Sequence, residues 1–163
     1  MNVEKFLSMD VLVKLSNAMD RYYDGDFGGY EEGYEHFHNA AGQATLIKAG
    51  AEDLGLRCDV VGLTDLPKGT EHHSSGEGYD WAFVEKRWVV DMWALSYLAH
   101  QHVVFDLKVP EDKEWVDRCL GPAPLWKVVD PGDKEMEIAR TIWSHVSLPY
   151  TAVDAMLGEL PER

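Results

Sequence analysis

A chain of 163 residues has the usual size of one compact domain, and its balance of 45% hydrophobic and 27% charged residues excludes a disordered chain. The formal net charge of −14 argues against direct nucleic-acid binding, because carboxylates repel phosphates. The same charge favours solubility, and it could also attract a basic protein partner or mimic nucleic acid. The sequence contains no apolar run that could span a membrane and does not open like a signal peptide, so a cytoplasmic location is expected.

Two cysteines, Cys58 and Cys119, lie far apart in the sequence and match no zinc spacing. This pattern predicts two reduced thiols rather than a disulfide. We find no repeat, no low-complexity tract and no linker rich enough to divide the chain. A single domain over residues 1–163 is therefore expected.

The first predicted helix follows Asp10, a candidate N-cap residue, and it precedes a glycine-punctuated acidic loop at residues 24–34. Its apolar residues recur at helical spacing and predict one buried stripe. The residues of this stripe are Leu12, Leu15, Met19 and Tyr22.

A second helix is expected to begin near Asn39, a good capping residue, and to end at about Leu54, just before Gly55. One face of this helix is mostly alanine, which lets another backbone approach closely. The pattern predicts a central, buried helix. The face consists of Ala40, Ala44, Ile47, Ala51 and Leu54.

From Arg57 onward the hydrophobic period changes to that of strands. Residues 58–63 predict a strand, and residues 64–78 a long polar loop. Two apolar segments at 81–84 and 88–91 flank the polar triplet 85–87 and predict a β-hairpin, and a further strand is expected within 102–107.

A short helix is expected after Pro110, with Trp115 and Leu120 on its inner side, followed by a proline-rich connecting loop that contains Pro122, Pro124 and Pro131. The last predicted helix is amphipathic and ends at Pro149. Its apolar residues are Met136, Ala139, Trp143 and Val146. Helices around a small antiparallel sheet predict an α+β fold.

The helix with its exit turn at residues 44–56 and the hairpin at residues 80–91 resemble the transglutaminase-like branch of the papain-type cysteine enzymes. Members of that family begin a small-residue-rich helix with a nucleophilic cysteine. Their hairpin carries the catalytic histidine and ends in the catalytic aspartate. The resemblance implies a papain/transglutaminase-like fold, with the central helix packed on a small antiparallel sheet, and it implies no cofactor.

Counting back from the turn glycine Gly55 places the family's cysteine at position 40, where this chain has Ala40. Asp91 fits the acidic member, and Asp80 stands where members with a short hairpin carry histidine, with Tyr79 as the other candidate. A thiolate at a helix N-terminus is stabilised by the helix dipole and activated by a histidine. Alanine offers no nucleophile, so the resemblance implies a chain that performs no covalent acyl transfer.

The expected cleft lies between the start of the helix at Ala40 and the hairpin from Asp80 to Asp91. Some family members read Gly-Gln-Cys, and the triplet at 42–44 offers a rival alignment, but Ala44 lies too close to the turn glycine. The residues expected to line the cleft, besides these, are Gln43, His72, His73, Tyr79 and Trp81. Gln43 is more often a helix-surface amide than an oxyanion donor.

Two functions are compatible with this pattern. The first is a catalytically degenerate protein that binds a protein or a small ligand. The alternative is an active cysteine peptidase, deamidase or amide transferase whose nucleophile, a cysteine at position 40, has been changed to Ala40, with His72 or His73 supplying the imidazole.

The same region of the sequence also contains residues suited to metal binding or acid–base chemistry. Five histidines and three aspartates supply enough metal ligands, yet none shows the His-x-x-x-His spacing of two ligands on one helix face. Asp80 and Asp91 could form a carboxylate pair for acid–base work, although such aspartates more often pair with a neighbour such as Arg87. The candidate metal ligands are His36, His38, His72, His73, His102, Asp24, Asp26 and Asp80.

Overall fold

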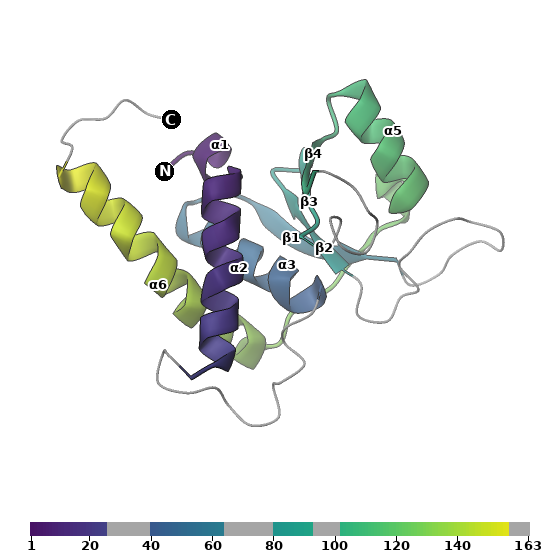
Figure 1. The fold of residues 1–163 in the computed structure, drawn as a ribbon. Helices are drawn as coiled ribbons and strands as arrows, with labels where there is room; N and C mark the ends of the chain where they lie inside the picture. The colour runs from purple at the N-terminus through teal and green to yellow at the C-terminus, as the bar shows by residue number, and fades with distance from the viewer. Residues whose placement is uncertain (26–39, 64–79, 93–101, 157–163) are drawn as a thin grey trace.

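The computed structural model describes residues 1–25, 40–63, 80–92 and 102–156, and the predicted α+β architecture is confirmed within them (Figure 1). A five-stranded antiparallel sheet in the order β4-β3-β2-β1-β5 has helices on both faces. The helices are α1 (Val3–Phe6), α2 (Met9–Tyr23), α3 (Ala40–Asp53), α5 (Pro110–Cys119), α6 (Asp133–Met156) and a short 3-10 turn η2 (Ala123–Leu125). The strands are β1 (Cys58–Gly62), β2 (Asp80–Val84), β3 (Trp88–Val90), β4 (Val104–Asp106) and β5 (Lys127–Val128).

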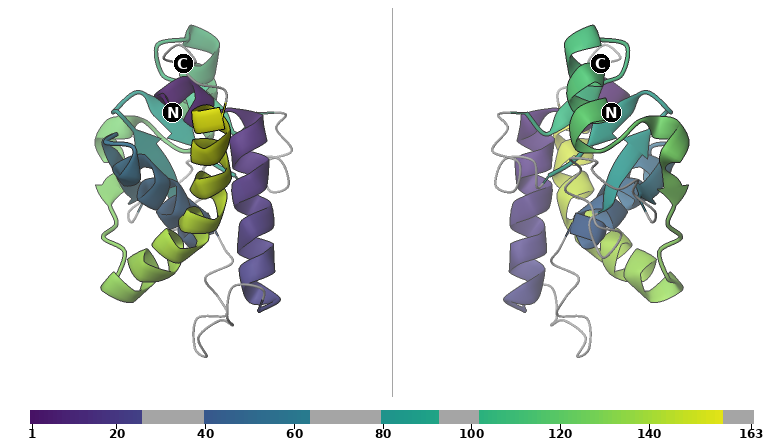
Figure 2. Two further views of the ribbon diagram at one scale, coloured as in Figure 1. Left: turned by 90° about the vertical axis from the view of Figure 1, so that its left-hand side faces the viewer. Right: turned by 90° about the vertical axis from the view of Figure 1, so that its right-hand side faces the viewer.

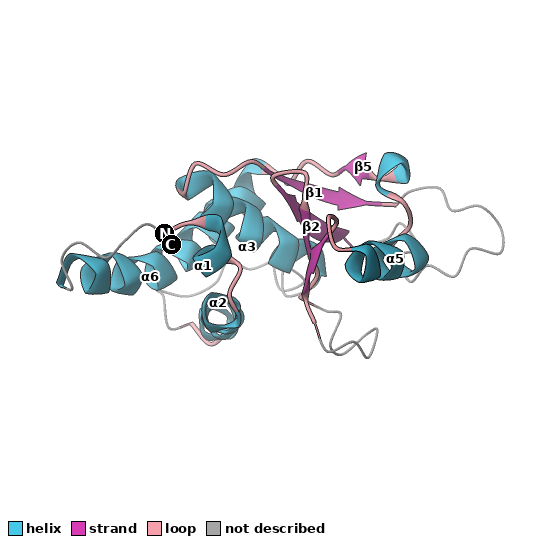
Figure 3. Ribbon diagram, turned by 90° about the horizontal axis from the view of Figure 1, so that it is seen from above, coloured by secondary structure: helices cyan, strands magenta, loops and turns pink. Residues whose placement is uncertain are grey.

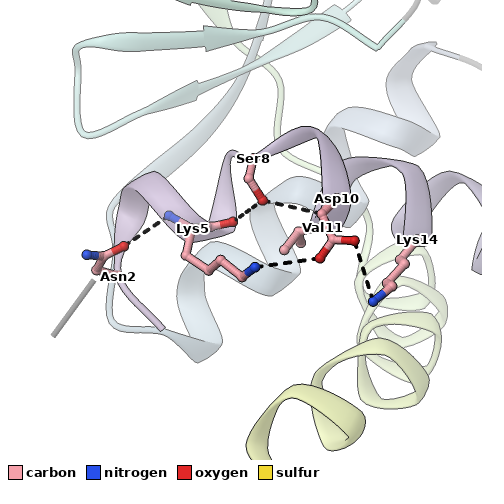
Figure 4. Close-up of polar contacts among 6 residues, drawn as sticks. All are labelled: Asn2, Lys5, Ser8, Asp10, Val11 and Lys14. Atoms are coloured by element: carbon pink, nitrogen blue, oxygen red, sulfur yellow. Dashed lines mark hydrogen bonds and ion pairs between the residues drawn. The ribbon is translucent and has the colours of Figure 1, made fainter. Parts of the chain in front are cut away.

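The start of α2 differs from the sequence prediction, because Ser8 and not Asp10 is its N-cap (Figure 4). Ser8 has an extended backbone, and its hydroxyl oxygen accepts from the backbone N–H of Val11. Asp10 lies in the first turn, where its carboxylate pairs with Lys5 and Lys14. The carboxylate also interacts favourably with the positive end of the helix dipole. The apolar stripe of α2 is confirmed, since all four of its predicted residues are buried.

The short helix α1 was absent from the sequence prediction. Asn2 caps it by accepting from the backbone N–H of Lys5 (Figure 4). Its last residue, Phe6, is fully buried and meets the ring of Trp143 edge-on at a centroid distance of 5.5 Å. This aromatic pair ties the N-terminus to α6.

Helix α3 is the central helix that the alanine-rich face predicted. It contacts β1, β2 and α6, and it ends at a turn where Gly55 has a φ of +74°. Gly50 allows the side chains of Phe6 and Trp143 to lie directly against the helix backbone. The indole N–H of Trp143 donates to the Oδ2 atom of Asp53 at 2.8 Å, and α6 contacts both α2 and α3 (Figure 2).

The two faces of the sheet belong to two apolar clusters. Alternation along the strands places Ala82, Val84 and Val90 in the larger cluster with α2, α3 and α6. It places Trp81 and Val89 in the smaller cluster beneath α5. The hairpin between β2 and β3 is confirmed, as are the strand within 102–107 and the inward positions of Trp115 and Leu120.

Two predictions for the C-terminal third are corrected. The connecting loop contains strand β5, which pairs with β1. Helix α6 does not end at Pro149 but continues to Met156. A proline within a helix removes one backbone hydrogen bond, and the remaining bonds carry the helix past it.

Candidate functional site

The amino end of α3 and one end of the sheet lie at the same end of the molecule. Helix α3 leads into β1 through a short turn, and the side-chain nitrogen of Lys48 donates to the backbone oxygen of Cys58 at 2.9 Å. From this contact the helix extends about 12 Å back to residue 40. Strand β1 advances about 13 Å from residue 58 to residue 62. From these lengths we infer that Gly62, the last residue of β1, lies near the level of the first turn of α3. Figure 1 shows α3 lying alongside β1 and β2.

The antiparallel register carries this relationship to the next strands. Gly62 pairs with Asp80 at the start of β2, and β3 ends at Val90 on the same side. The backbone N–H of Asp91 donates to the oxygen of Val103 at 2.8 Å, which brings the start of β4 to this end as well. We call this place the α3 end of the sheet. It is bounded by Ala40, Gly62, Asp80, Asp91 and Val103.

Asp91 is the most buried charged residue of the described chain, with 2% of its surface exposed. Burial of a carboxylate is costly unless the fold surrounds it with polar partners. An aspartate that only ended a strand would stand in solvent. The position expected for the acidic group is thus an enclosed one.

Asp80 is half-buried, and burial raises the pKa of its carboxyl group above the ordinary value. Within the described residues it forms no hydrogen bond and no ion pair. Strand alternation places it on the sheet face of Ala82, which packs against α3. Among the described residues, Asp80 is therefore an acid without a neutralising partner on the helix-facing side of the α3 end.

The register gives no support to a carboxylate pair of Asp80 and Asp91. Ala82 pairs with Val90, so Asp80 shares the parity of Val90, whereas Asp91 follows Val90 and has the opposite parity. The expected pairing with Arg87 is corrected too. Arg87 lies at the far end of the hairpin, where it binds Asp106 through two hydrogen bonds of 2.9 and 2.8 Å.

Neither cysteine lies at the α3 end. Cys58 is buried at the opposite end of β1, and burial raises its pKa to about 12. Cys119 belongs to α5, beneath the other face of the sheet. Both thiols are free, as the sequence predicted. The chain has no third cysteine, so no residue in the first turn of α3 carries a thiol.

The remaining predicted cleft residues have different environments. Gln43, in the first turns of α3, is half-buried, and its buried side-chain oxygen Oε1 has no hydrogen-bond partner in the part of the chain that the structure describes. Trp81 is fully buried, with its ring edge-on to that of Trp126 at 5.2 Å, and is a core residue. Tyr79, His72 and His73 lie outside the described residues.

The metal hypothesis finds no assembled ligand set among the described residues, where no three His, Cys, Asp or Glu side chains are grouped closely enough to bind an ion. Of its candidates, Asp80 and the exposed His102 stand at the α3 end, on β2 and beside β4. Asp24 follows α2, and Asp26, His36, His38, His72 and His73 lie outside the described ranges.

Comparison with known proteins gives no relative. No family model, no curated protein and no solved structure matches this chain. Among the helices of the described residues, none combines the length and the apolar character needed to cross a bilayer.

Proposed function

We propose that this chain is a transglutaminase-like domain of papain-type fold that binds a protein or a small ligand without covalent turnover. One observation carries the proposal: the first turn of α3, Asp80 and Asp91 belong to the same end of the sheet, with Asp80 on the helix-facing side and Asp91 of opposite parity. The resemblance assigns a nucleophile, its partner and an orienting acid to these three positions, and the opposite parity of Asp80 and Asp91 favours a degenerate form of that site. Alanine at position 40 and the absence of a third cysteine remove the nucleophile from it.

The electrostatics of the site also favour binding over acyl transfer. A cysteine nucleophile reacts as its thiolate, which positive neighbours stabilise. Asp80 instead places a carboxyl group on the helix-facing side, and the only buried thiol, Cys58, has a pKa of about 12. The net charge of −14 favours a basic protein or a cationic small molecule as the ligand.

The test compares the native chain with the variant Ala40→Cys. Both receive a short glutamine-containing peptide and a fluorescent primary amine, and the release of ammonia and the labelling of the peptide are measured. We expect no turnover by the native chain. We also expect amide-resonance shifts for the first turn of α3 and for Asp80 and Asp91 when the same peptide is titrated.

Turnover by the native chain, or a peptide titration that leaves the α3 end unchanged, would overturn the proposal. Turnover that appears only in Ala40→Cys would favour the alternative of a cysteine enzyme whose nucleophile has been replaced. An inactive Ala40→Cys variant that still binds the peptide supports a degenerate site, in which Asp80 cannot do the work of histidine.

A further inference from the structure

Strand β5 forms one edge of the sheet and has exposed apolar side chains. The strand order places it outside β1, with no strand beyond it among the described residues (Figure 3). Val128 has 67% of its surface exposed, and Leu125, at the end of the preceding turn, has 44% exposed. Both belong to the small set of exposed large hydrophobic residues in the described chain. Apolar side chains on a sheet edge are characteristic of a surface that pairs with another strand.

The backbone of this edge has hydrogen-bonding groups to offer. The N–H of Val129 donates to the oxygen of Val60 at 2.8 Å, so residue 129 directs its polar backbone groups toward β1. Lys127, paired with Gly62, does the same by alternation. The N–H and C=O of Val128 therefore point away from the sheet, beside an exposed side chain.

The edge is held rigidly from behind. Trp126 lies on the same sheet face as Val128, and its ring meets those of Trp81 and Phe83 edge-on at 5.2 and 5.1 Å. Its indole N–H donates to the backbone oxygens of Leu120 and Gly121, both at 3.0 Å. A preformed strand lowers the entropic cost of adding another one.

The charges beside the edge indicate which occupant fits. Continuing the register of β1 and β5 by two residues places Asp59 opposite Asp130, on the sheet face of Val128. Neither carboxylate forms an ion pair within the described residues. Lys127 has the opposite parity and points to the other face. A cation bound next to these two carboxylates would reduce the repulsion between them.

We infer that the β5 edge binds an extended, basic segment of a partner protein by strand addition, with an apolar residue over Val128 and a lysine or arginine beside Asp59 and Asp130. A second copy of this chain is the other possible occupant, but two chains that each carry a net charge of −14 repel one another. This inference uses a different surface from the α3 end and stands independently of the proposed function.

The test uses a short synthetic peptide in which valine and lysine lie two residues apart, separated by threonine, so that both point to the same face of the added strand. It is labelled for fluorescence anisotropy. Its controls are the same peptide with glutamate in place of lysine, and a version with N-methylated valines that cannot donate a hydrogen bond. We expect the lysine peptide to bind, with an affinity that falls as salt is added, and both control peptides to bind at least about tenfold more weakly.

The protein variants are Val128→Pro and Val128→Thr. Proline removes only the outward N–H, which edge strands tolerate, whereas threonine keeps it. We expect the dissociation constant of the lysine peptide to rise about tenfold in Val128→Pro and to stay within about twofold in Val128→Thr. Three results would overturn the inference: no binding of the lysine peptide, equal binding of the glutamate or N-methylated peptide, or a dimer of the native chain in sedimentation equilibrium. All three are measured on the native chain, so they do not depend on whether Val128→Pro folds.

Discussion

Asp80 pairs with Gly62 at the last rung of the β1–β2 ladder, so no side chain lies directly opposite the carboxyl group on β1. Burial against the helical layer is then the main influence on its ionisation, and the pKa of Asp80 is raised. This one pairing fixes an acidic group at the end of the sheet where α3 begins. It is also the source of a measurable pH dependence.

The substitution Asp80→Asn should stabilise the fold at neutral pH. Because the folded-state pKa lies above the ordinary value of 3.8, the folded protein binds this proton more tightly than the unfolded chain does. Stability therefore falls as pH rises from the ordinary value through the folded pKa, and the loss persists above it. Urea unfolding across this pH range should show the advantage of Asp80→Asn shrinking to nothing on acidification.

Asp106→Asn provides a control of opposite sign. The hydrogen bond from Arg87 holds the pKa of Asp106 below its ordinary value, so this carboxylate stabilises the fold at neutral pH and loses that effect as pH falls. Asp106→Asn should therefore be less stable than the native chain at neutral pH. If the stabilities of Asp80→Asn and Asp106→Asn relative to the native chain changed in the same direction with pH, the environments assigned to the two carboxyl groups would be wrong.

The two thiols should differ sharply in reactivity. At neutral pH, a pKa of about 12 for Cys58 against the ordinary 9.0 lowers its thiolate fraction about a thousandfold. Treatment with iodoacetamide followed by peptide mass mapping should find Cys119 modified in the native state and Cys58 only after unfolding. Rapid labelling of Cys58 in the folded protein would contradict its burial.

Gly50→Ala should destabilise the fold by about 2 kcal/mol, although alanine is the better helix former. The added Cβ would lie 2.7 Å from Cε1 of Phe6 and 3.1 Å from Cε3 of Trp143, both on buried rings that cannot move aside. Gly132→Ala is the control, because the three atoms nearest to its Cβ all belong to the carboxylate group of Glu135, which can rotate away. Thermal unfolding should give a clearly lower Tm for Gly50→Ala than for Gly132→Ala.

Lys86→Gly should stabilise the hairpin by about 1 kcal/mol. Glu85 and Lys86 have φ values of 53° and 50°, a left-handed conformation that costs energy for residues with a Cβ. Lys86→Ala keeps the Cβ, so its stability should rise little above that of the native chain. If urea unfolding gives both variants equal stability, backbone strain is not the reason.

The helices and the hairpin could be predicted because their signals are local. The stripe of α2 and the alanine face of α3 repeat at the helical period, and the turn at Gly55 requires a positive φ that glycine supplies. The polar triplet between two apolar segments was enough to place β2 and β3. The charge pattern could not say which partner Arg87 binds, since Asp106 comes from a distant strand.

The elements that sequence reasoning missed have no local signal. Strand β5 has two residues, and its extended conformation depends on backbone pairing with β1. Helix α1 has a single turn. The relationship of Asp80 to Asp91 depends on a register in which one residue of slip exchanges the two faces. Sequence spacing placed both aspartates on the hairpin but could not assign their faces.

The central claim is that the first turn of α3 lies beside Asp80, and the ionisation of a thiol introduced by Ala40→Cys tests it most directly. In a Cys119→Ser background, the pH dependence of iodoacetamide labelling gives the pKa of this thiol. If the two positions are neighbours, adding Asp80→Asn removes a nearby negative charge, lowers that pKa and raises the labelling rate at neutral pH about threefold. Asp117→Asn on α5 should leave the rate unchanged. An introduced thiol that responds equally to both substitutions, or to neither, would contradict the account.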